Sequence, residues 1–127
     1  MDRRPVGVFD SGVGGLTVFK ELEARLPHES LLYLGDTARV PYGTRSPETV
    51  VRYSIEAAHF FRSNDVKMVV VACNTASSVA LPDLAREAGV PVLGVIEPGA
   101  RQAAARTRSG KIGVIGTRAT VRSSAYT

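Results

Sequence analysis

Cysteine is almost absent from this chain, because Cys73 is the only one among 127 residues. A single cysteine excludes an internal disulfide framework and is typical of a reducing compartment. No apolar run approaches the ~18 residues that a membrane span needs. The charged N-terminus is not followed by the apolar segment of a signal peptide. We therefore predict a cytoplasmic protein with no membrane partner.

Blocks of like charge are also missing. The 16 basic and 12 acidic residues give a net charge of +4 and are scattered along the chain. A nucleic-acid-binding domain normally carries its basic residues as a patch or stripe. The charge pattern therefore argues against a nucleic-acid partner.

The sequence contains no candidate residues for a metal site or for a covalently bound cofactor. No lysine follows a predicted strand, so no Schiff-base lysine for pyridoxal phosphate can be named. No cluster of His, Cys, Asp and Glu has metal-ligand spacing. His28 and His59 lie far from Cys73 in sequence and are predicted to be surface residues, which removes support for a Cys–His hydrolase. We expect neither a metal nor a cofactor.

What the sequence does have is an alternation of two patterns. Five short apolar, β-branched runs, apolar on both faces, lie at 6–9, 31–34, 68–72, 92–96 and 112–115. Such runs are typical of buried parallel strands. Helical patterns lie between them, at 16–26, 47–62, 75–87 and 99–108. The alternation predicts an α/β fold with a parallel sheet and flanking helices.

Capping residues support two of these helices. Ser46 is a candidate N-cap with Pro47 at the first helical position. Gly89 is a candidate C-cap for the helix at 75–87. Residues 35–46 have no periodicity and form a long connection, which in a compact domain is often functional.

Small polar and acidic residues follow every predicted strand. In an open parallel sheet, ligands bind outside the carboxyl ends of the strands. The residues there predict one cleft lined by hydroxyls, amides, a thiol and carboxylates. In chain order they are Asp10-Ser11-Gly12, Gly35-Asp36-Thr37, Cys73-Asn74-Thr75, Glu97-Pro98 and Gly116-Thr117.

Cys73 is the candidate catalytic group of that cleft. A lone cysteine is most often a small buried apolar residue. Its position favours chemistry, because it follows a strand and precedes a helix start, whose field stabilises a thiolate. Asn74 and Thr75 offer hydrogen-bond donors to a carboxylate. Asp10, at a neighbouring strand end, is the candidate partner for the thiol proton.

The glycine-rich turn at residues 10–15 leaves alternatives open. Such turns before a helix bind anions through backbone N–H groups. The turn is neither a Walker A loop nor a dinucleotide fingerprint, because the required lysine and third glycine spacing are absent. A nucleotide-phosphate site and a tight turn with no ligand are both compatible with it.

Three groups of motifs together resemble bacterial glutamate racemases, of the aspartate/glutamate racemase superfamily. They are Phe9-Asp10-Ser11-Gly12-Val13-Gly14-Gly15-Leu16, Asp36-Thr37 with Val40-Pro41-Tyr42-Gly43, and Ala72-Cys73-Asn74-Thr75-Ala76-Ser77. Ile115-Gly116-Thr117 with Ala119-Thr120 fits the same family. The motifs stand in the family's order and extend over nearly the whole chain.

The resemblance implies a function and a set of site residues. Two pseudo-symmetric α/β domains would flank the active site, with one cysteine from each domain and no cofactor. One thiolate would remove the Cα proton of glutamate, and the other thiol would protonate the opposite face. Cys73 would act on D-glutamate, assisted by Asp10. The implied substrate contacts are Asp10, Ser11, Tyr42, Gly43, Asn74, Thr75 and Thr117, with Thr120 as an addition.

The same resemblance implies a domain division. Residues 1–98 would form the first racemase domain, and residues 99–127 a linker helix and the first strand and helix of a truncated second domain. Residues 6–11 resemble residues 112–117 at an offset of 106, which is compatible with a duplicated unit. The chain ends within an expected helix and lacks the family's second cysteine motif. We therefore expect part of a longer protein, inactive as a racemase on its own.

Two further expectations concern partners. A domain of this kind would expose an apolar flank and self-associate, and a homodimer is to be tested. A non-catalytic module that acts through a protein partner is the alternative to an enzyme that binds glutamate.

Overall fold

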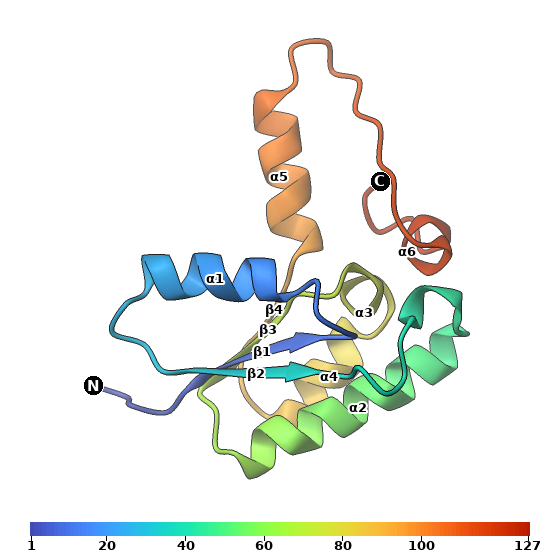
Figure 1. The fold of residues 1–127 in the computed structure, drawn as a ribbon. Helices are drawn as coiled ribbons and strands as arrows, with labels where there is room; N and C mark the ends of the chain where they lie inside the picture. The colour runs from blue at the N-terminus through green and yellow to red at the C-terminus, as the bar shows by residue number, and fades with distance from the viewer.

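A four-stranded parallel sheet forms the centre of the molecule (Figure 1). The computed structural model describes residues 1–127. The strands run in the order β2-β1-β3-β4, and each neighbouring pair is parallel. This confirms the predicted α/β class. The strands are β1 (Val6–Asp10), β2 (Leu31–Gly35), β3 (Met68–Val71) and β4 (Val92–Gly94).

Helices cover the two faces of the sheet unequally. Helices α2 (Pro47–Ser63) and α4 (Leu81–Ala88) lie on one side, and α1 (Leu16–Arg25) lies on the other (Figure 1). Successive strand residues point to opposite faces. In β1, Phe9 belongs to the core cluster that includes Phe61 of α2 and Leu84 of α4. The main core therefore lies between the sheet and α2–α4.

The opposite face is only partly covered. Helix α1 has no buried residue, and Leu16 at its start and Leu26 just after its end are exposed. Leu93 of β4 is 56 % exposed. These leucines are exposed one by one, and a continuous apolar flank with self-association through it stays a prediction.

The predicted caps are found. Ser46 Oγ accepts a hydrogen bond from the Thr49 N–H at 3.2 Å, and Pro47 is the first residue of α2. Gly89 ends α4 in the left-handed conformation, with φ of 66°. These local signals worked because each one satisfies backbone groups that a helix end leaves free.

The helix predicted at 75–87 is two helices, so that prediction is wrong in one respect. Helix α3 (Asn74–Val79) ends at Ala80, and α4 begins at Leu81. Pro82 lies in the first turn of α4. Proline has no N–H to bond to the preceding turn, and its ring clashes with the carbonyl four residues earlier. The chain therefore breaks the helix just before Pro82.

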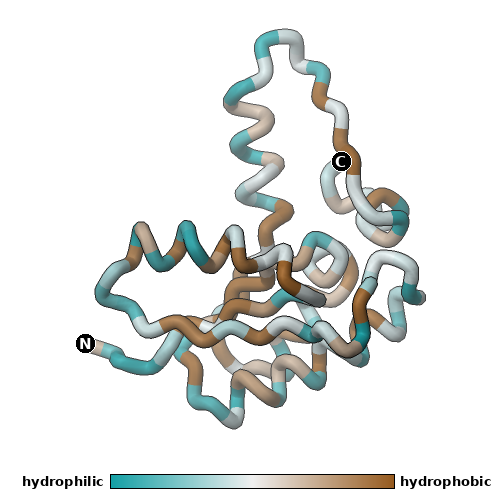
Figure 2. The backbone as a smooth tube through the Cα atoms, viewed as in Figure 1, coloured by the Kyte–Doolittle hydropathy of each residue, from teal (hydrophilic) through white to brown (hydrophobic).

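The fifth strand, predicted at 112–115, is not formed. Residues 111–117 have no regular secondary structure, and Ile115 is 99 % exposed. A strand needs a neighbour for its backbone groups. Helix α5 (Ile96–Arg106) instead carries the chain away from the sheet, so the segment finds no neighbour (Figure 1). Figure 2 shows its apolar stretch between α5 and the C-terminal turn.

The boundaries around α5 also differ from the prediction. Strand β4 ends at Gly94 rather than at 96, and α5 begins at Ile96 rather than at Gly99. The proposed domain boundary between residues 98 and 99 thus falls inside a helix, and the two-domain division stays a prediction. The last helix, α6 (Arg118–Arg122), is short and is followed by a turn at Ser124 with φ of 56°.

Candidate active site

A cleft of about 610 Å³ lies at the carboxyl ends of β1 and β3. Six of the predicted site residues line it: Asp10, Ser11, Cys73, Asn74, Thr75 and Thr117. They come from the ends of two strands, the first turn of α3 and the segment before α6. The convergence follows from parallel strands, whose carboxyl ends meet at one edge of the sheet.

Cys73 lines this cleft and is the N-cap of α3. The residue is buried, and its Sγ accepts a hydrogen bond from the Ala76 N–H at 3.4 Å. Its thiol donates to Ser11 Oγ at 3.5 Å. A backbone N–H directed at sulfur stabilises negative charge on it. The sulfur of Cys73 is therefore held by hydrogen bonds to the first turn of α3 and to Ser11.

The Asp10 carboxylate is hydrogen-bonded to the backbone of its own loop. Its Oδ2 accepts hydrogen bonds from the Gly12 N–H at 3.1 Å and the Gly15 N–H at 3.0 Å. No hydrogen bond joins Asp10 to Cys73, and Ser11 is the side chain that contacts the thiol. Asp10 lines the same cleft as Cys73, but its role as proton partner of Cys73 stays a prediction.

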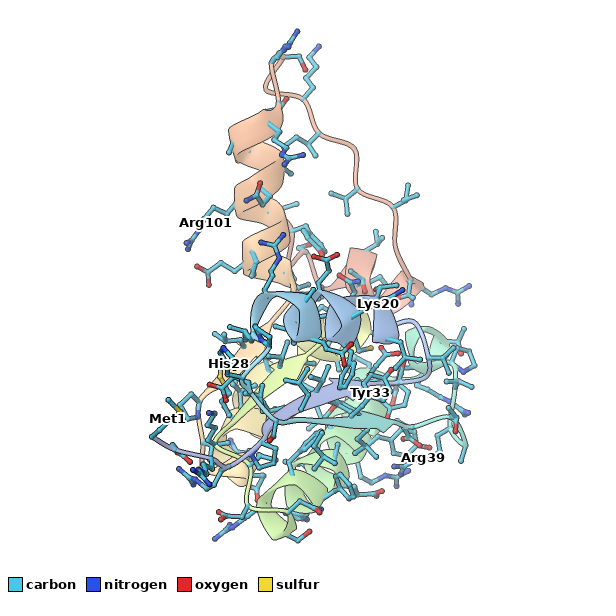
Figure 3. The ribbon with its side chains drawn as sticks, turned by 60° about the vertical axis from the view of Figure 1, so that its left-hand side comes forward. Met1, Lys20, His28, Tyr33, Arg39 and Arg101 are labelled. Carbon is cyan, nitrogen blue, oxygen red and sulfur yellow. The ribbon has the colours of Figure 1, made fainter.

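Tyr33 supports the same loop from β2, and no sequence pattern singles this residue out. Figure 3 shows the Tyr33 side chain on the ribbon. Its hydroxyl donates to the Gly12 carbonyl at 2.9 Å, and its ring packs edge-on against Phe19 of α1. Burial, with the neighbouring Asp10 and Cys73, raises the pKa of Tyr33 to about 12. The phenol is thus a neutral hydrogen-bond donor at ordinary pH.

Thr75 and Thr117 form one wall of the cleft, and the buried Thr120 continues their line of hydroxyls behind it. Thr75 Oγ1 lies 2.8 Å from Thr117 Oγ1, which lies 3.0 Å from Thr120 Oγ1. Thr117 also caps α6 by accepting from the Thr120 N–H. A Cβ added to Gly43 would lie 2.4 Å from Thr117 Cβ, so only glycine allows this approach. Gly43 therefore stands directly behind the threonine wall.

The Tyr42 side chain points elsewhere. It is 1 % exposed, belongs to the core cluster and does not line the Cys73 cleft. Its hydroxyl donates to Asp36, which also pairs with Arg39. Burial, followed by this hydrogen bond to Asp36, raises the pKa of Tyr42 well above its usual value. A substrate contact by Tyr42 therefore stays a prediction. Because the side chain is buried in the core, only the backbone of Tyr42 is left to make such a contact.

Several residues lie away from the cleft. Glu97, predicted at a strand end, is exposed on α5 and pairs with Arg101. His28 and His59 are surface residues, as the sequence predicts, and His59 lies near Glu87. No group of three His, Cys, Asp or Glu side chains is placed to hold a metal ion. None of the helices has the length and apolar character needed to cross a membrane.

Tyr126 is a cleft residue that sequence reasoning missed. Its hydroxyl donates to Asn74 Oδ1 at 2.6 Å, although 52 residues separate the two in sequence. It lines the Cys73 cleft together with Asn74. No spacing pattern could have found it, because the contact depends on the return of the chain through residues 111–117.

These features define an α/β domain with an open parallel sheet and a thiol-centred polar cleft. Residues 14–127 match the family described as Asp/Glu/Hydantoin racemase. The chain belongs to that family. Among curated proteins, the glutamate racemase of Geobacter metallireducens is 64% identical over 126 residues, which are 99% of this chain and 47% of that protein.

Solved structures agree. The glutamate racemase of Aquifex pyrophilus superposes with a TM-score of 0.94 at 57% identity, covering 96% of this chain and 48% of that one. The Francisella tularensis glutamate racemase, solved in complex with D-glutamate, gives a TM-score of 0.91 at 42% identity, covering 99% and 47%. The chain spans about half the length of the relatives it matches.

Proposed function

We propose that these residues form one half of the catalytic apparatus of a glutamate racemase, with Cys73 as the acid/base for one face of the substrate Cα. The observation that carries the proposal is a single buried thiol that lines a cleft together with hydroxyl, amide and carboxylate side chains. Relatives named glutamate racemase, more than half identical to this chain, support the choice of glutamate.

The proton transfer can be written for this cleft. The Cys73 thiolate takes the Cα proton, becoming a thiol, and the electron pair of the C–H bond stays on the substrate as a carbanion. The carbanion delocalises into the α-carboxylate. Hydrogen-bond donors aimed at that carboxylate stabilise the developing charge. The Asn74 amide and the hydroxyls of Thr75 and Thr117 are the donors that the cleft offers.

Inversion needs a second acid on the opposite face of Cα. These 127 residues contain no second cysteine. In the two-thiol scheme that the resemblance implies, the second thiol therefore comes from residues other than these. We expect the 127-residue chain alone to exchange a Cα proton but not to racemise glutamate.

The nucleotide alternative fits the cleft poorly. The N–H groups of Gly12 and Gly15, which would cradle a phosphate, are already bonded to the Asp10 carboxylate. A phosphate at this turn would also meet the negative charge of Asp10. A protein-binding module without catalytic activity stays open as an alternative. Retained binding of its protein partner after Cys73→Ala would favour that alternative.

The experiment is solvent exchange at Cα. The chain is incubated in D2O with D- or L-glutamate and followed by proton NMR. We expect loss of the Cα proton signal from D-glutamate without conversion to L-glutamate, and we expect Cys73→Ala to abolish it. Exchange undiminished in Cys73→Ala, or racemisation by the chain alone, would overturn the proposal. Stabilisation by ATP and not by D-glutamate would favour the nucleotide alternative.

The wider role follows from the same family. D-Glutamate supplies peptidoglycan synthesis and hence cell-wall biogenesis and cell shape, so we propose a bacterial cytoplasmic enzyme without a cofactor. A homodimer stays a prediction. Sedimentation of the chain at increasing concentration tests it.

A further inference from the structure

Asn74 has its acceptor oxygen occupied before any substrate arrives. It is the first residue of α3, and its exposed side chain lines the Cys73 cleft. The Tyr126 hydroxyl donates to its Oδ1 at 2.6 Å. A carboxamide has one acceptor oxygen and two N–H donors on nitrogen. This contact therefore distinguishes the two ends of the amide and leaves both donors for another partner.

Tyr126 is itself held from two sides. It lies against the first turns of α5, where a Cβ added to Gly99 would be 3.7 Å from its ring and from its hydroxyl. The turn at Ser124 closes before it, with the Thr127 N–H bonded to the Ser124 carbonyl at 3.1 Å. The phenol is therefore placed by packing and by the backbone, and not only by Asn74.

The position of Tyr126 also separates two hollows. The tyrosine lines the Cys73 cleft and also a groove of about 760 Å³ beneath α5. Asn74 belongs to the first of these and not to the second. The Tyr126 hydroxyl therefore bonds Asn74 at the border between the Cys73 cleft and the groove beneath α5.

We infer that Tyr126 is a positioning residue, whose hydroxyl holds the Asn74 amide so that its N–H donors face the Cys73 cleft. A carboxylate in that cleft then accepts from an amide that cannot flip without breaking a hydrogen bond. The identification of that carboxylate as glutamate rests on the proposed function, whereas the orientation of Asn74 does not.

The test uses the whole chain and the substitution Tyr126→Phe, which removes only the hydroxyl. Proton–nitrogen NMR of the ligand-free protein reports the Asn74 side-chain NH2 pair, assigned by its loss in Asn74→Ala. We expect the pair to shift in Tyr126→Phe and to stay in place in the control Tyr53→Phe. Tyr53 lies on α2, where its ring stacks against the Arg39 guanidinium and not against Asn74. An unchanged Asn74 pair in Tyr126→Phe would overturn the inference.

A second readout uses D-glutamate titrated into the same proteins. Loss of one positioned hydrogen bond is expected to weaken binding by about 2- to 10-fold in Tyr126→Phe. Asn74→Ala combined with Tyr126→Phe should bind no more weakly than Asn74→Ala alone, because the two residues act as one unit. Fully additive losses would contradict the inference. Absence of binding by the unmodified chain would count against the proposed function, and the NH2 signal would still decide about Tyr126.

Discussion

Residues 1–98 and residues 99–127 are built in different ways. The first region holds the sheet, α2, α4 and a continuous apolar core. In the second region Thr120 is the only buried residue, and most of α5 and residues 111–117 are exposed. Its attachment near the cleft is mainly polar, through the Thr117 hydroxyl on Thr75 and the Tyr126 hydroxyl on Asn74.

The difference shows how this site is assembled. A region with its own core can hold Cys73 and the Asp10 loop in place, because close packing leaves few alternative positions. A region held by a few hydrogen bonds opens at a lower free energy. Cleft residues from both regions meet at the start of α3. The thiol that we propose as the acid/base thus lies in the region with its own core, and part of the proposed binding wall lies in the weakly attached region.

The largest effect should come from the core of the first region. Phe61 of α2 is fully buried and packs over Gly7, where an added Cβ would lie 2.6 Å from its ring. Phe61→Ala should lower the free energy of unfolding by ~3–5 kcal/mol. Urea unfolding followed by circular dichroism measures it. Phe60→Ala, at a half-buried neighbouring position, should cost clearly less; equal losses would argue against the described core.

A smaller and local effect is expected at the polar attachment. Thr117→Val keeps the shape of the side chain but removes the hydroxyl that bonds Thr75 and caps α6. Loss of a cap and hydrogen bond should cost α6 about 1 kcal/mol, or roughly five-fold faster amide exchange. Hydrogen–deuterium exchange of α6 measures this. Thr107→Val, near the end of α5, is the control, and equal exchange in both variants would refute the attachment.

The stability of the chain at alkaline pH tests the contact of Tyr33 with the Asp10 loop in the first region. The pKa of Tyr33 is raised to about 12, mainly by burial, against about 10 in an unfolded chain. The folded state therefore prefers the neutral phenol. Its contribution is complete below pH ~10 and is lost as the pH rises towards 12. Urea unfolding between pH 8 and 11 should show a decline that Tyr33→Phe reduces. Identical pH profiles for the unmodified chain and Tyr33→Phe would mean that the Tyr33 hydroxyl is exposed to solvent instead.

Local signals in the sequence predicted the first region well. The runs at 6–9, 31–34 and 68–72 became strands because partners and covering helices exist for each of them. The cleft residues converged because strand carboxyl ends converge. The run at 112–115 has the same composition but no neighbouring strand, which composition cannot reveal. Tyr33 and Tyr126 were missed because they reach their partners over 21 and 52 residues.

The smallest effect is expected in the segment where the sequence-based prediction was wrong. Ile115 is 99 % exposed, so Ile115→Lys should change the free energy of unfolding by less than ~0.5 kcal/mol. Urea unfolding measures it, with Val71→Ala in β3 as the buried counterpart. A loss above ~1 kcal/mol would mean that Ile115 is buried in solution. Residues 112–115 would then pair as the strand that their composition favours, and the neighbour would have to be another copy of the chain, so the loss should grow with protein concentration.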